Sequence, residues 1–399
     1  MEKNYKKFKR IFLIVTDSLG CGEAKDAHLY NDNGSNTLKH LSYSIKDFSI
    51  PNLEKMGIGK LTDVNNTRND LDSIASYGKM EEISVGKDTL TGHWEMMGLK
   101  VENPFPSFTD TGFPKDLIDK IEEVAGRKVI GNIAASGTEI IKDLGEEHLK
   151  TGAIIVYTSS DSVLQIAANE AIVPIEELYD ICAKVRKITL DNKDWSVGRI
   201  IARPFIGDSK DNFTRTAKRH DYAVDPSGET TLDFLKENDY DVISVGKIKD
   251  IFNGKGITEA YKISSNHNGM EVTCEIAKKD FTGLCFVNLV DFDALYGHRR
   301  DAAGYAKCLM EFDNDLNCLL PLLNEDDLLI ITADHGNDPV HHGTDHTRED
   351  VPVLIYNKNI IPGDLGVLKS FACLGKTISD NFNSKSTEYG KVIDIKLNK

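Results

Sequence analysis

The chain is 399 residues long and carries a formal net charge of −15 at neutral pH. This length is ample for one large domain or two ordinary ones, and the acidic balance argues against nucleic acid or an anionic membrane as the main partner. Phosphorylated substrates remain compatible with it, because metal ions and a few arginines reverse the field locally.

The N-terminus is basic, as in a secretion signal, but the apolar run that follows is short. It extends only over residues 11–15, too short for a signal core or a membrane span. The seven cysteines are scattered and none has Cys-x-x-Cys spacing, a pattern typical of reduced thiols. We therefore expect a cytoplasmic protein that does not enter a membrane.

Short apolar runs alternate with segments of helical periodicity along the chain. The strands predicted in chain order are residues 11–15, 153–157, 241–245, 284–290, 328–332 and 351–356. The predicted helices are residues 115–125, 174–190, 230–238 and 302–323. This alternation predicts an α/β fold with a parallel sheet covered by helices on both faces. The C-terminal residues 383–399 are predicted to be a surface tail or a short helix.

The middle of the chain differs from the rest. Residues 103–222 begin near Pro104 and Pro106, end on an arginine-rich loop and contain no cluster of metal-binding type. We predict a smaller domain here, inserted into a core formed by residues 1–102 and 223–399.

Polar residues follow three of the predicted strands directly. Asp17 follows the first strand, Asp291 and Asp293 follow the strand at 284–290, and the pair Asp334-His335 follows the strand at 328–332. Open α/β sheets bind ligands beyond the carboxyl ends of their strands. Three distant parts of the chain are therefore expected to meet in one site.

Six residues at or near these strand ends have side chains that bind metal ions. They are Asp17, Asp293, His298, Asp334, His335 and His346. Carboxylate oxygen and imidazole nitrogen suit Mn²⁺ or Zn²⁺, and six such groups are enough for two ions with open positions. A single member of the set would equally be a capping aspartate or a hydrogen-bonded histidine. Five neighbours are interpreted as surface groups or as partners that orient the ligands: Asp291, Asp338, Asp345, His341 and His342.

A second motif occupies residues 86–95, where glycines bracket Thr89 and Thr91. Alone it is compatible with an ordinary capped helix start. Beside a pair of metal ions, a threonine hydroxyl becomes a nucleophile for phosphorus, and the amides of a helix N-terminus stabilise a phosphate.

Three basic residues are candidates for a phosphate clamp: Arg199, Arg215 and Lys247. Arginine forks match phosphate geometry. The alternative for each is a solvated basic surface.

These motifs together resemble those of a known family. Residues 16–23, 86–95, 291–301, 333–339 and 343–349 resemble the motifs of the prokaryotic phosphopentomutases, which belong to the alkaline phosphatase superfamily. Residues 156–167 and 219–223 extend the resemblance over nearly the whole chain. One departure is His342, which stands where the family motif leads us to expect proline.

The resemblance implies a fold, a cofactor and a set of roles. It implies an alkaline-phosphatase-like α/β core with an inserted smaller α/β cap and two Mn²⁺ ions, other divalent cations being possible. One ion would be held by Asp293, His298 and His346, and the other by Asp17, Asp334 and His335. Thr89 would be the residue that becomes phosphorylated. The sugar phosphate would be bound by Ser159, Asp161, Arg199, Ile201, Arg215 and Lys247.

The activity implied is the interconversion of α-D-ribose 1-phosphate and D-ribose 5-phosphate, and of the 2-deoxy forms, through a sugar 1,5-bisphosphate. Glucose 1,6-bisphosphate or a pentose 1,5-bisphosphate would activate the enzyme, which we expect to be a monomer. Two alternatives remain open at this point. One is a phosphatase or a cofactor-independent phosphoglycerate mutase of the same superfamily, and the other is a sugar-phosphate sensor without activity.

Overall fold

The computed structural model describes residues 6–159 and 162–398. The chain divides into two compact units. Unit 1 comprises Met1–Asn103 and Asp225–Lys399, and unit 2 comprises Pro104–Val224. Unit 2 is therefore inserted in the sequence of unit 1. That it acts as a cap stays a prediction.

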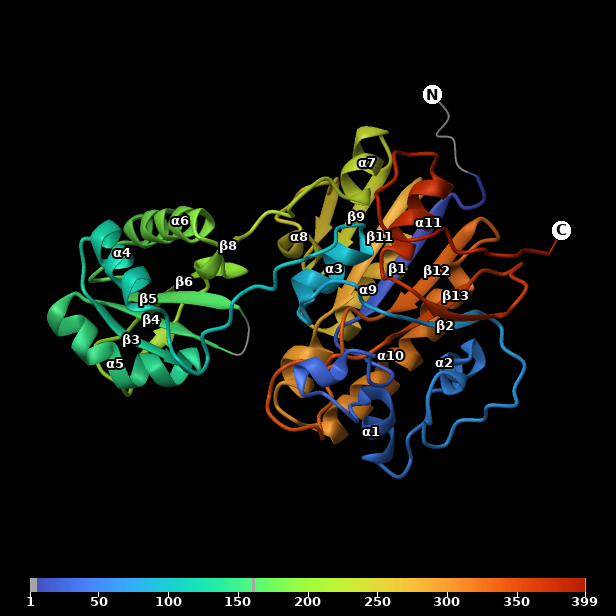
Figure 1. The fold of residues 1–399 in the computed structure, drawn as a ribbon, viewed down its shortest axis with the longest axis horizontal. Helices are drawn as coiled ribbons and strands as arrows, with labels where there is room; N and C mark the ends of the chain where they lie inside the picture. Colours follow the sequence, from blue (N-terminus) through green and yellow to red (C-terminus); the bar gives the residue numbers. More distant parts are fainter. Residues whose placement is uncertain (1–5, 160–161, 399) are drawn as a thin grey trace. The chain divides into compact units, whose positions relative to one another are not determined.

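Unit 1 is built on an eight-stranded sheet of order β10-β9-β11-β1-β12-β13-β2-β14 (Figure 1). The strands are β1 (Arg10–Thr16), β2 (Ser76–Met80), β9 (Asp241–Val245), β10 (Glu259–Tyr261), β11 (Gly283–Leu289), β12 (Asp327–Thr332), β13 (Val351–Tyr356) and β14 (Asp364–Leu368). From β10 to β12 all neighbours are parallel, whereas β13 is antiparallel to both β12 and β2. The sheet is thus mainly parallel.

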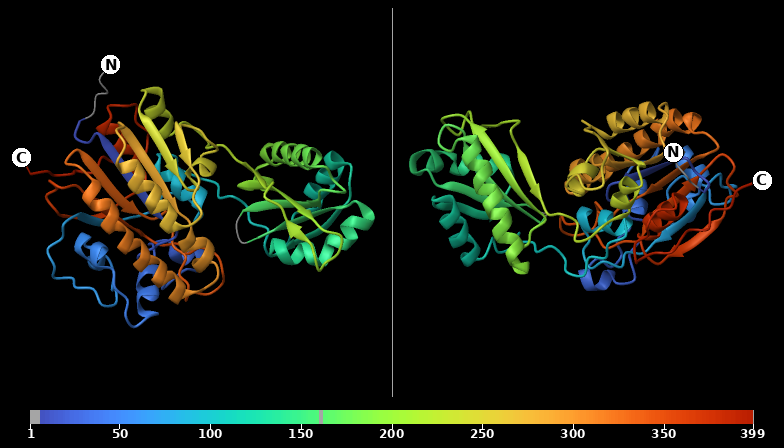
Figure 2. Two further views of the ribbon diagram at one scale, coloured as in Figure 1. Left: turned by 180° about the vertical axis from the view of Figure 1, so that it is seen from behind. Right: turned by 90° about the horizontal axis from the view of Figure 1, so that it is seen from above.

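Helices cover both faces of this sheet, as the views in Figure 2 show. They are α1 (Thr37–Tyr43), α2 (Pro51–Met56), α3 (Thr89–Met96), α7 (Thr231–Glu237), α8 (Ile248–Ile251), α9 (Asn266–Ala277), α10 (Ala302–Leu322) and α11 (Cys373–Asn381). Every residue of β1, β11 and β12 is buried. This is why these strands are continuous apolar runs rather than alternating ones.

Unit 2 has its own sheet, of order β3-β4-β5-β6-β7 with β8 paired to β6. Its strands are β3 (Val129–Ala134), β4 (Ile154–Thr158), β5 (Val163–Asn169), β6 (Arg199–Ile206), β7 (Thr214–Arg215) and β8 (His220–Ala223). Its helices are α4 (Lys115–Ala125), α5 (Gly137–Thr151) and α6 (Ile175–Asp191). Alternate residues of β4 face opposite sides: Ile154 and Val156 pack with α4 and α6, and Ile155 and Tyr157 pack with α5.

The predicted α/β class with a mainly parallel sheet is confirmed, as are the six strands and four helices. One detail was wrong, because the strand at 351–356 is antiparallel to its neighbours. The strand near residues 153–157 belongs to the sheet of unit 2, within the range predicted for the inserted domain. The C-terminal segment is also not simply a surface tail, because Ile393 and Ile395 are buried against unit 1. Across the described parts of the chain, no helix combines the length and apolarity needed to cross a bilayer.

Candidate metal centre and nucleophile

Three adjacent strands bring polar residues to one edge of the sheet. In the parallel trio β11-β1-β12, Thr16 is level with Leu289 and Val15 is level with Thr332. Asp17 directly follows β1, Asp334 lies two residues beyond β12, and β11 is followed by a short π-helix, η4 (Phe292–Gly297). The shared register therefore places these three chain segments side by side.

Asp17, Asp334 and His335 form a first group of potential ligands, all buried. Nε2 of His335 lies 3.7 Å from Oδ1 of Asp17 and 3.4 Å from Oδ2 of Asp334. These two carboxylate oxygens are buried without a hydrogen-bond partner among the described residues. Buried polar atoms normally have partners, and a divalent cation would satisfy both oxygens. The group therefore fits a metal ion.

Burial and close charges shift the pKa values of all three side chains in this group. Burial raises the pKa of Asp17 well above its usual value, and the carboxylates of Asp334 and Asp293 add to the rise. Burial also opposes ionisation of Asp334, but the neighbouring His335 and His93 hold its pKa at about 2. Burial lowers the pKa of His335, which favours the neutral imidazole that binds metals.

Asp293, His298 and His346 form a second group. Nε2 of His298 lies 3.1 Å from Oδ2 of Asp293 and 3.2 Å from Nε2 of His346, which is itself 3.5 Å from Oδ1 of Asp293. Burial disfavours ionisation of Asp293, but His346 and His298 outweigh it and hold the pKa well below its usual range. The rings of His335 and His346 are 4.0 Å apart between centroids. The two groups are therefore adjacent.

Hydrogen bonds from outside this second group orient its members. Nδ1 of His298 donates to the carbonyl of Thr344 at 2.8 Å, which directs Nε2 of His298 towards Asp293 and His346. Nδ2 of Asn337 donates to Oδ1 of Asp293 at 2.7 Å, and Arg300 donates in turn to Oδ1 of Asn337. The carboxylate of Asp293 is thus held in place by a chain of two buried or half-buried side chains.

Thr89 is the first residue of α3, and its hydroxyl lies 3.2 Å from Nε2 of His335. Asp88 caps the helix by accepting from the N–H of Thr91 at 3.1 Å and from its hydroxyl at 2.6 Å. A Cβ atom on Gly92 would lie 2.2 Å from the carbonyl oxygen of Asp334. Only glycine lets the first turn of α3 approach the ligands this closely. The structure therefore places the predicted nucleophile beside the first group.

Two polar residues that line the first group were not identified from the sequence. Nδ2 of Asn288 donates to Oδ2 of Asp17 at 2.9 Å. Nδ1 of His93, one turn along α3 from Thr89, lies 2.9 Å from the carbonyl of Thr89 and 3.2 Å from Oδ2 of Asp334. Both are fully buried. The signal for Asn288 was a lone amide within the apolar run of β11.

The residues predicted to bind the sugar phosphate fall in both units. Lys247 is in unit 1, at the start of α8, and its positive charge counteracts the rise in the pKa of Asp17. In unit 2, Arg199 on β6 lies 3.8 Å from Asp221, and Arg215 is exposed on β7. Ser159 follows β4, and Ile201 is buried on β6. Asp161 lies outside the described residues.

The acidic neighbours that were interpreted as orienting or surface groups have structural contacts. Asp291 accepts from the N–H of Asn266 at 2.7 Å. Asp338 accepts from the N–H of Asn36 at 2.8 Å and contacts Nδ1 of His40 at 2.5 Å.

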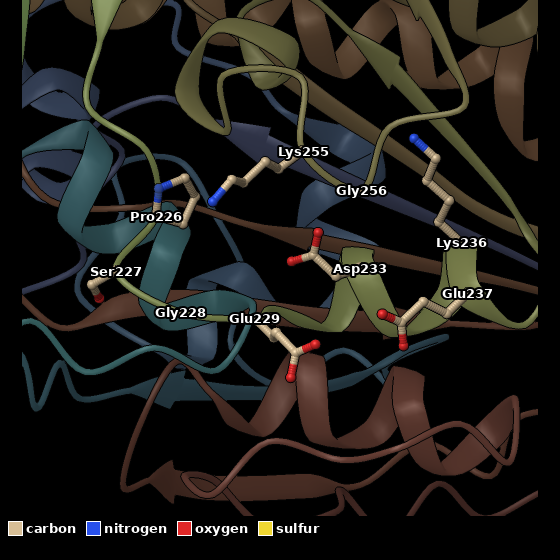
Figure 3. Close-up of a pocket in the computed structure, with 9 residues that line it drawn as sticks. All are labelled: Pro226, Ser227, Gly228, Glu229, Asp233, Lys236, Glu237, Lys255 and Gly256. Atoms are coloured by element: carbon tan, nitrogen blue, oxygen red, sulfur yellow. The ribbon is translucent and has the colours of Figure 1, made fainter.

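A polar hollow of about 660 Å³ in unit 1 contains none of the predicted site residues (Figure 3). It is lined by Pro226, Ser227, Gly228, Glu229, Asp233, Lys236, Glu237, Lys255 and Gly256. Its central carboxylate, Asp233, accepts from the N–H and hydroxyl of Thr230 and so completes the N-terminus of α7. Lys255 pairs with Asp225 at 3.3 Å. Glu229 pairs with Lys385, and Lys236 donates to the carbonyl of Ile257. Four of the charged side chains of the hollow thus already have structural partners.

Comparisons with known proteins identify the family of this chain and a shared fold. The model of a family described as the Metalloenzyme superfamily matches residues 9–386. The structure is similar to that of the PH0037 protein from Pyrococcus horikoshii, with a TM-score of 0.51 and 16% identity over 96% of this chain and 100% of the other. It is also similar to a phosphoglycerate mutase from Leishmania mexicana, with a TM-score of 0.48 and 13% identity over 100% of this chain and 99% of the other. At such low identity, the likeness to PH0037 shows a common fold only.

Proposed function

The chain is an enzyme of the Metalloenzyme superfamily, and from that premise we propose that it is a phosphopentomutase. It would interconvert α-D-ribose 1-phosphate and D-ribose 5-phosphate, and the 2-deoxy forms. The observation that carries the proposal is the Thr89 hydroxyl at the start of a helix, 3.2 Å from His335 of the first group of potential ligands, which lies beside the second group. The motif resemblance supports the choice of substrate.

In this proposal the six ligands would hold two divalent ions, Mn²⁺ by resemblance. Asp17, Asp334 and His335 would hold one, and Asp293, His298 and His346 the other. Such a pair supplies positive charge to the phosphoryl oxygens and to the attacking and leaving oxygens of an in-line displacement.

Thr89 would be the group that carries the phosphoryl between the two positions of the sugar. Phospho-Thr89 gives its phosphoryl group to the free hydroxyl of the monophosphate, which forms a 1,5-bisphosphate. The bisphosphate then returns its other phosphoryl group to Thr89 and leaves as the isomeric monophosphate. The backbone N–H groups at the N-terminus of α3 would stabilise the added negative charge. A sugar bisphosphate such as glucose 1,6-bisphosphate would prime the unphosphorylated enzyme.

The remaining predicted residues would bind the sugar. Arg199 and Arg215 suit the phosphate that is not being transferred, because a guanidinium fork matches its oxygens. Lys247, Ser159, Asp161 and Ile201 would complete the sugar-phosphate site. Closure of unit 2 over the sugar would exclude water, and a mutase needs this if it is not to act as a phosphatase.

The test is conversion of ribose 1-phosphate to ribose 5-phosphate, followed by ³¹P NMR, with Mn²⁺ and a trace of glucose 1,6-bisphosphate. We expect Thr89→Ala to lower kcat by a factor on the order of 10⁴ or more, as loss of a nucleophile does, while bound metal is unchanged. Thr89→Ser, which keeps a hydroxyl, should retain activity and should be phosphorylated in peptide mass spectra. Net release of inorganic phosphate by the wild type, or turnover of 3-phosphoglycerate instead of pentose phosphates, would favour the alternative enzymes.

A further inference from the structure

Two adjacent histidines, His341 and His342, stand apart from the metal centre described above. Both turn to the loop that follows the short helix η1 (Ala27–Tyr30). Nε2 of His341 lies 3.7 Å from Oδ1 of Asp32 and 3.3 Å from the carbonyl oxygen of Asn31. Nε2 of His342 lies 2.7 Å from the same carbonyl oxygen. A ligand atom from each of the three side chains lies within 4.8 Å of the others.

These distances are close to those of a metal site. An ion bound tetrahedrally at about 2.0–2.2 Å separates its ligand atoms by roughly 3.4 Å. The distances of 3.7 and 3.3 Å from Nε2 of His341 lie on either side of this value. The distance of 2.7 Å from Nε2 of His342 to the Asn31 carbonyl is shorter, and a rotation of the exposed His342 side chain would lengthen it. Two imidazole nitrogens, a carboxylate oxygen and a carbonyl oxygen form a ligand set that suits borderline transition ions.

The carboxylate of Asp32 is already oriented for such a role. It is only 3% exposed, and its Oδ2 accepts from Nζ of Lys87 at 3.0 Å and from the backbone N–H of Arg348 at 2.8 Å. These bonds direct Oδ1 towards His341. Lys87 also pairs with Asp345 at 3.4 Å, so two carboxylates face this one ammonium group. The local charge therefore still favours a cation.

We propose that Asp32, His341 and His342, with the carbonyl of Asn31, form a third divalent-metal site that takes a transition ion such as Zn²⁺. The site is separate from the six ligands of the centre. It links the loop after η1 to the loop that also contains His346, so its occupancy stiffens a segment that supplies a ligand to that centre. In the absence of an ion, hydrogen bonds to the Asn31 carbonyl hold the two rings.

The test counts zinc ions in the full-length protein. Chelator-treated protein is dialysed against a buffer of fixed free Zn²⁺, and bound zinc per chain is measured by atomic emission. We expect His342→Ala to bind one ion fewer than the wild type, and His342→Cys to keep that ion because a thiolate also binds zinc. The matched control is His28→Ala, a change of another exposed histidine, which should bind as many ions as the wild type.

The design separates this site from the proposed dimetal centre. Failure of the six ligands to bind zinc lowers the count of every variant equally, whereas the third site appears as a difference between wild type and His342→Ala. Equal counts for these two proteins would overturn the proposal. A second readout is the thermal midpoint, which Zn²⁺ should raise more in the wild type than in His342→Ala, with equal midpoints for the two proteins in chelator.

Discussion

At the scale of single residues, the centre depends on side chains that are not themselves ligands. Asn337 is fully buried and connects Asp293 to Arg300. Asn288 likewise donates a hydrogen bond to the carboxylate of Asp17. Such contacts fix a carboxylate in the rotamer that presents its free oxygen to an ion, and their removal leaves the ligand in place but badly oriented.

Replacing Asn337 by alanine should therefore lower the metal affinity of the centre by roughly 10–100-fold. Isothermal titration with Mn²⁺ measures this directly. The control is Asn314→Ala on the exposed side of α10, which should bind Mn²⁺ like the wild type. Equal affinities for Asn337→Ala and wild type would show that Asp293 needs no partner to stay in position.

Glu349 provides a pH-dependent test of a buried carboxyl group beside the centre. It accepts from the backbone N–H and the hydroxyl of Thr37 and from the hydroxyl of Thr347, but burial dominates and raises its pKa to about 7. The folded state then keeps a proton that the unfolded chain has lost. Glu349 by itself should lower the free energy of unfolding by about 3 kcal/mol as pH rises from about 4.5 to 7, and should add no further change above this range.

The substitution Glu349→Gln removes this titration. The difference in free energy of unfolding, variant minus wild type, should increase between about pH 4.5 and 7. Any effect of the new amide that does not depend on pH shifts the whole profile equally and leaves this increase unchanged. Urea unfolding of chelator-treated protein at a series of pH values measures the difference. Parallel pH profiles would contradict the expectation, and the exposed Glu146→Gln serves as the control whose profile should follow the wild type.

At the scale of elements, α3 is held rigidly beside the ends of β1 and β12. Asp88 caps its N-terminus. Near its other end, the carboxylate of Glu95 accepts from the N–H groups of Ile83, Ser84 and Phe371. A helix fixed at both ends places its first residue precisely, and here that residue is Thr89.

The close approach of α3 to the Asp334 carbonyl makes Gly92 sensitive to any added side chain. Gly92→Ala should destabilise the protein by about 1–3 kcal/mol, since its Cβ would meet a backbone atom that cannot give way easily. It should also reduce turnover, because the helix that positions Thr89 must shift. Denaturant unfolding and the mutase assay test both effects. The control is Gly363→Ala, where a Cβ would meet nothing within 4 Å.

At the scale of the whole molecule, each unit has a sheet and a hydrophobic core of its own, as an independent domain does. Unit 1 has a complete sheet with helices on both faces, and unit 2 has hydrophobic clusters on both faces of its own sheet. The six potential ligands and Thr89 all belong to unit 1. Arg199 and Arg215, which we propose bind the sugar phosphate, belong to unit 2.

Replacing residues 104–224 by a short glycine-serine linker should therefore separate phosphoryl transfer at Thr89 from isomerisation of the sugar phosphate. We expect the remaining unit 1 to fold, to bind metal and to hydrolyse a simple phosphate ester slowly, because water then reaches phospho-Thr89. It should no longer isomerise ribose 1-phosphate. Circular dichroism, metal analysis and the two assays measure these outcomes. Retention of isomerase activity would show that unit 2 is not the sugar-binding cap.

Much of the fold followed from local patterns. Buried strands such as β1 and β12 are recognisable because parallel strands covered on both faces must be apolar throughout. Potential ligands such as Asp17 and Asp334 were recognisable because they lie at or near the ends of such strands, and the carboxyl ends of parallel strands gather at one edge. These are properties of neighbouring residues, so the amino-acid sequence by itself determined them.

Other features depend on contacts between residues far apart in the chain, and only the tertiary structure decided them. The antiparallel direction of β13, the partners Asn288 and Asn337, and the approach of Gly92 to Asp334 all belong to this class. His342 is the clearest case, because it is four residues from His346 and yet its side chain contacts Asn31, in the loop after η1. Side-chain direction in a loop is set by what packs around it, and that packing is absent from the order of the residues.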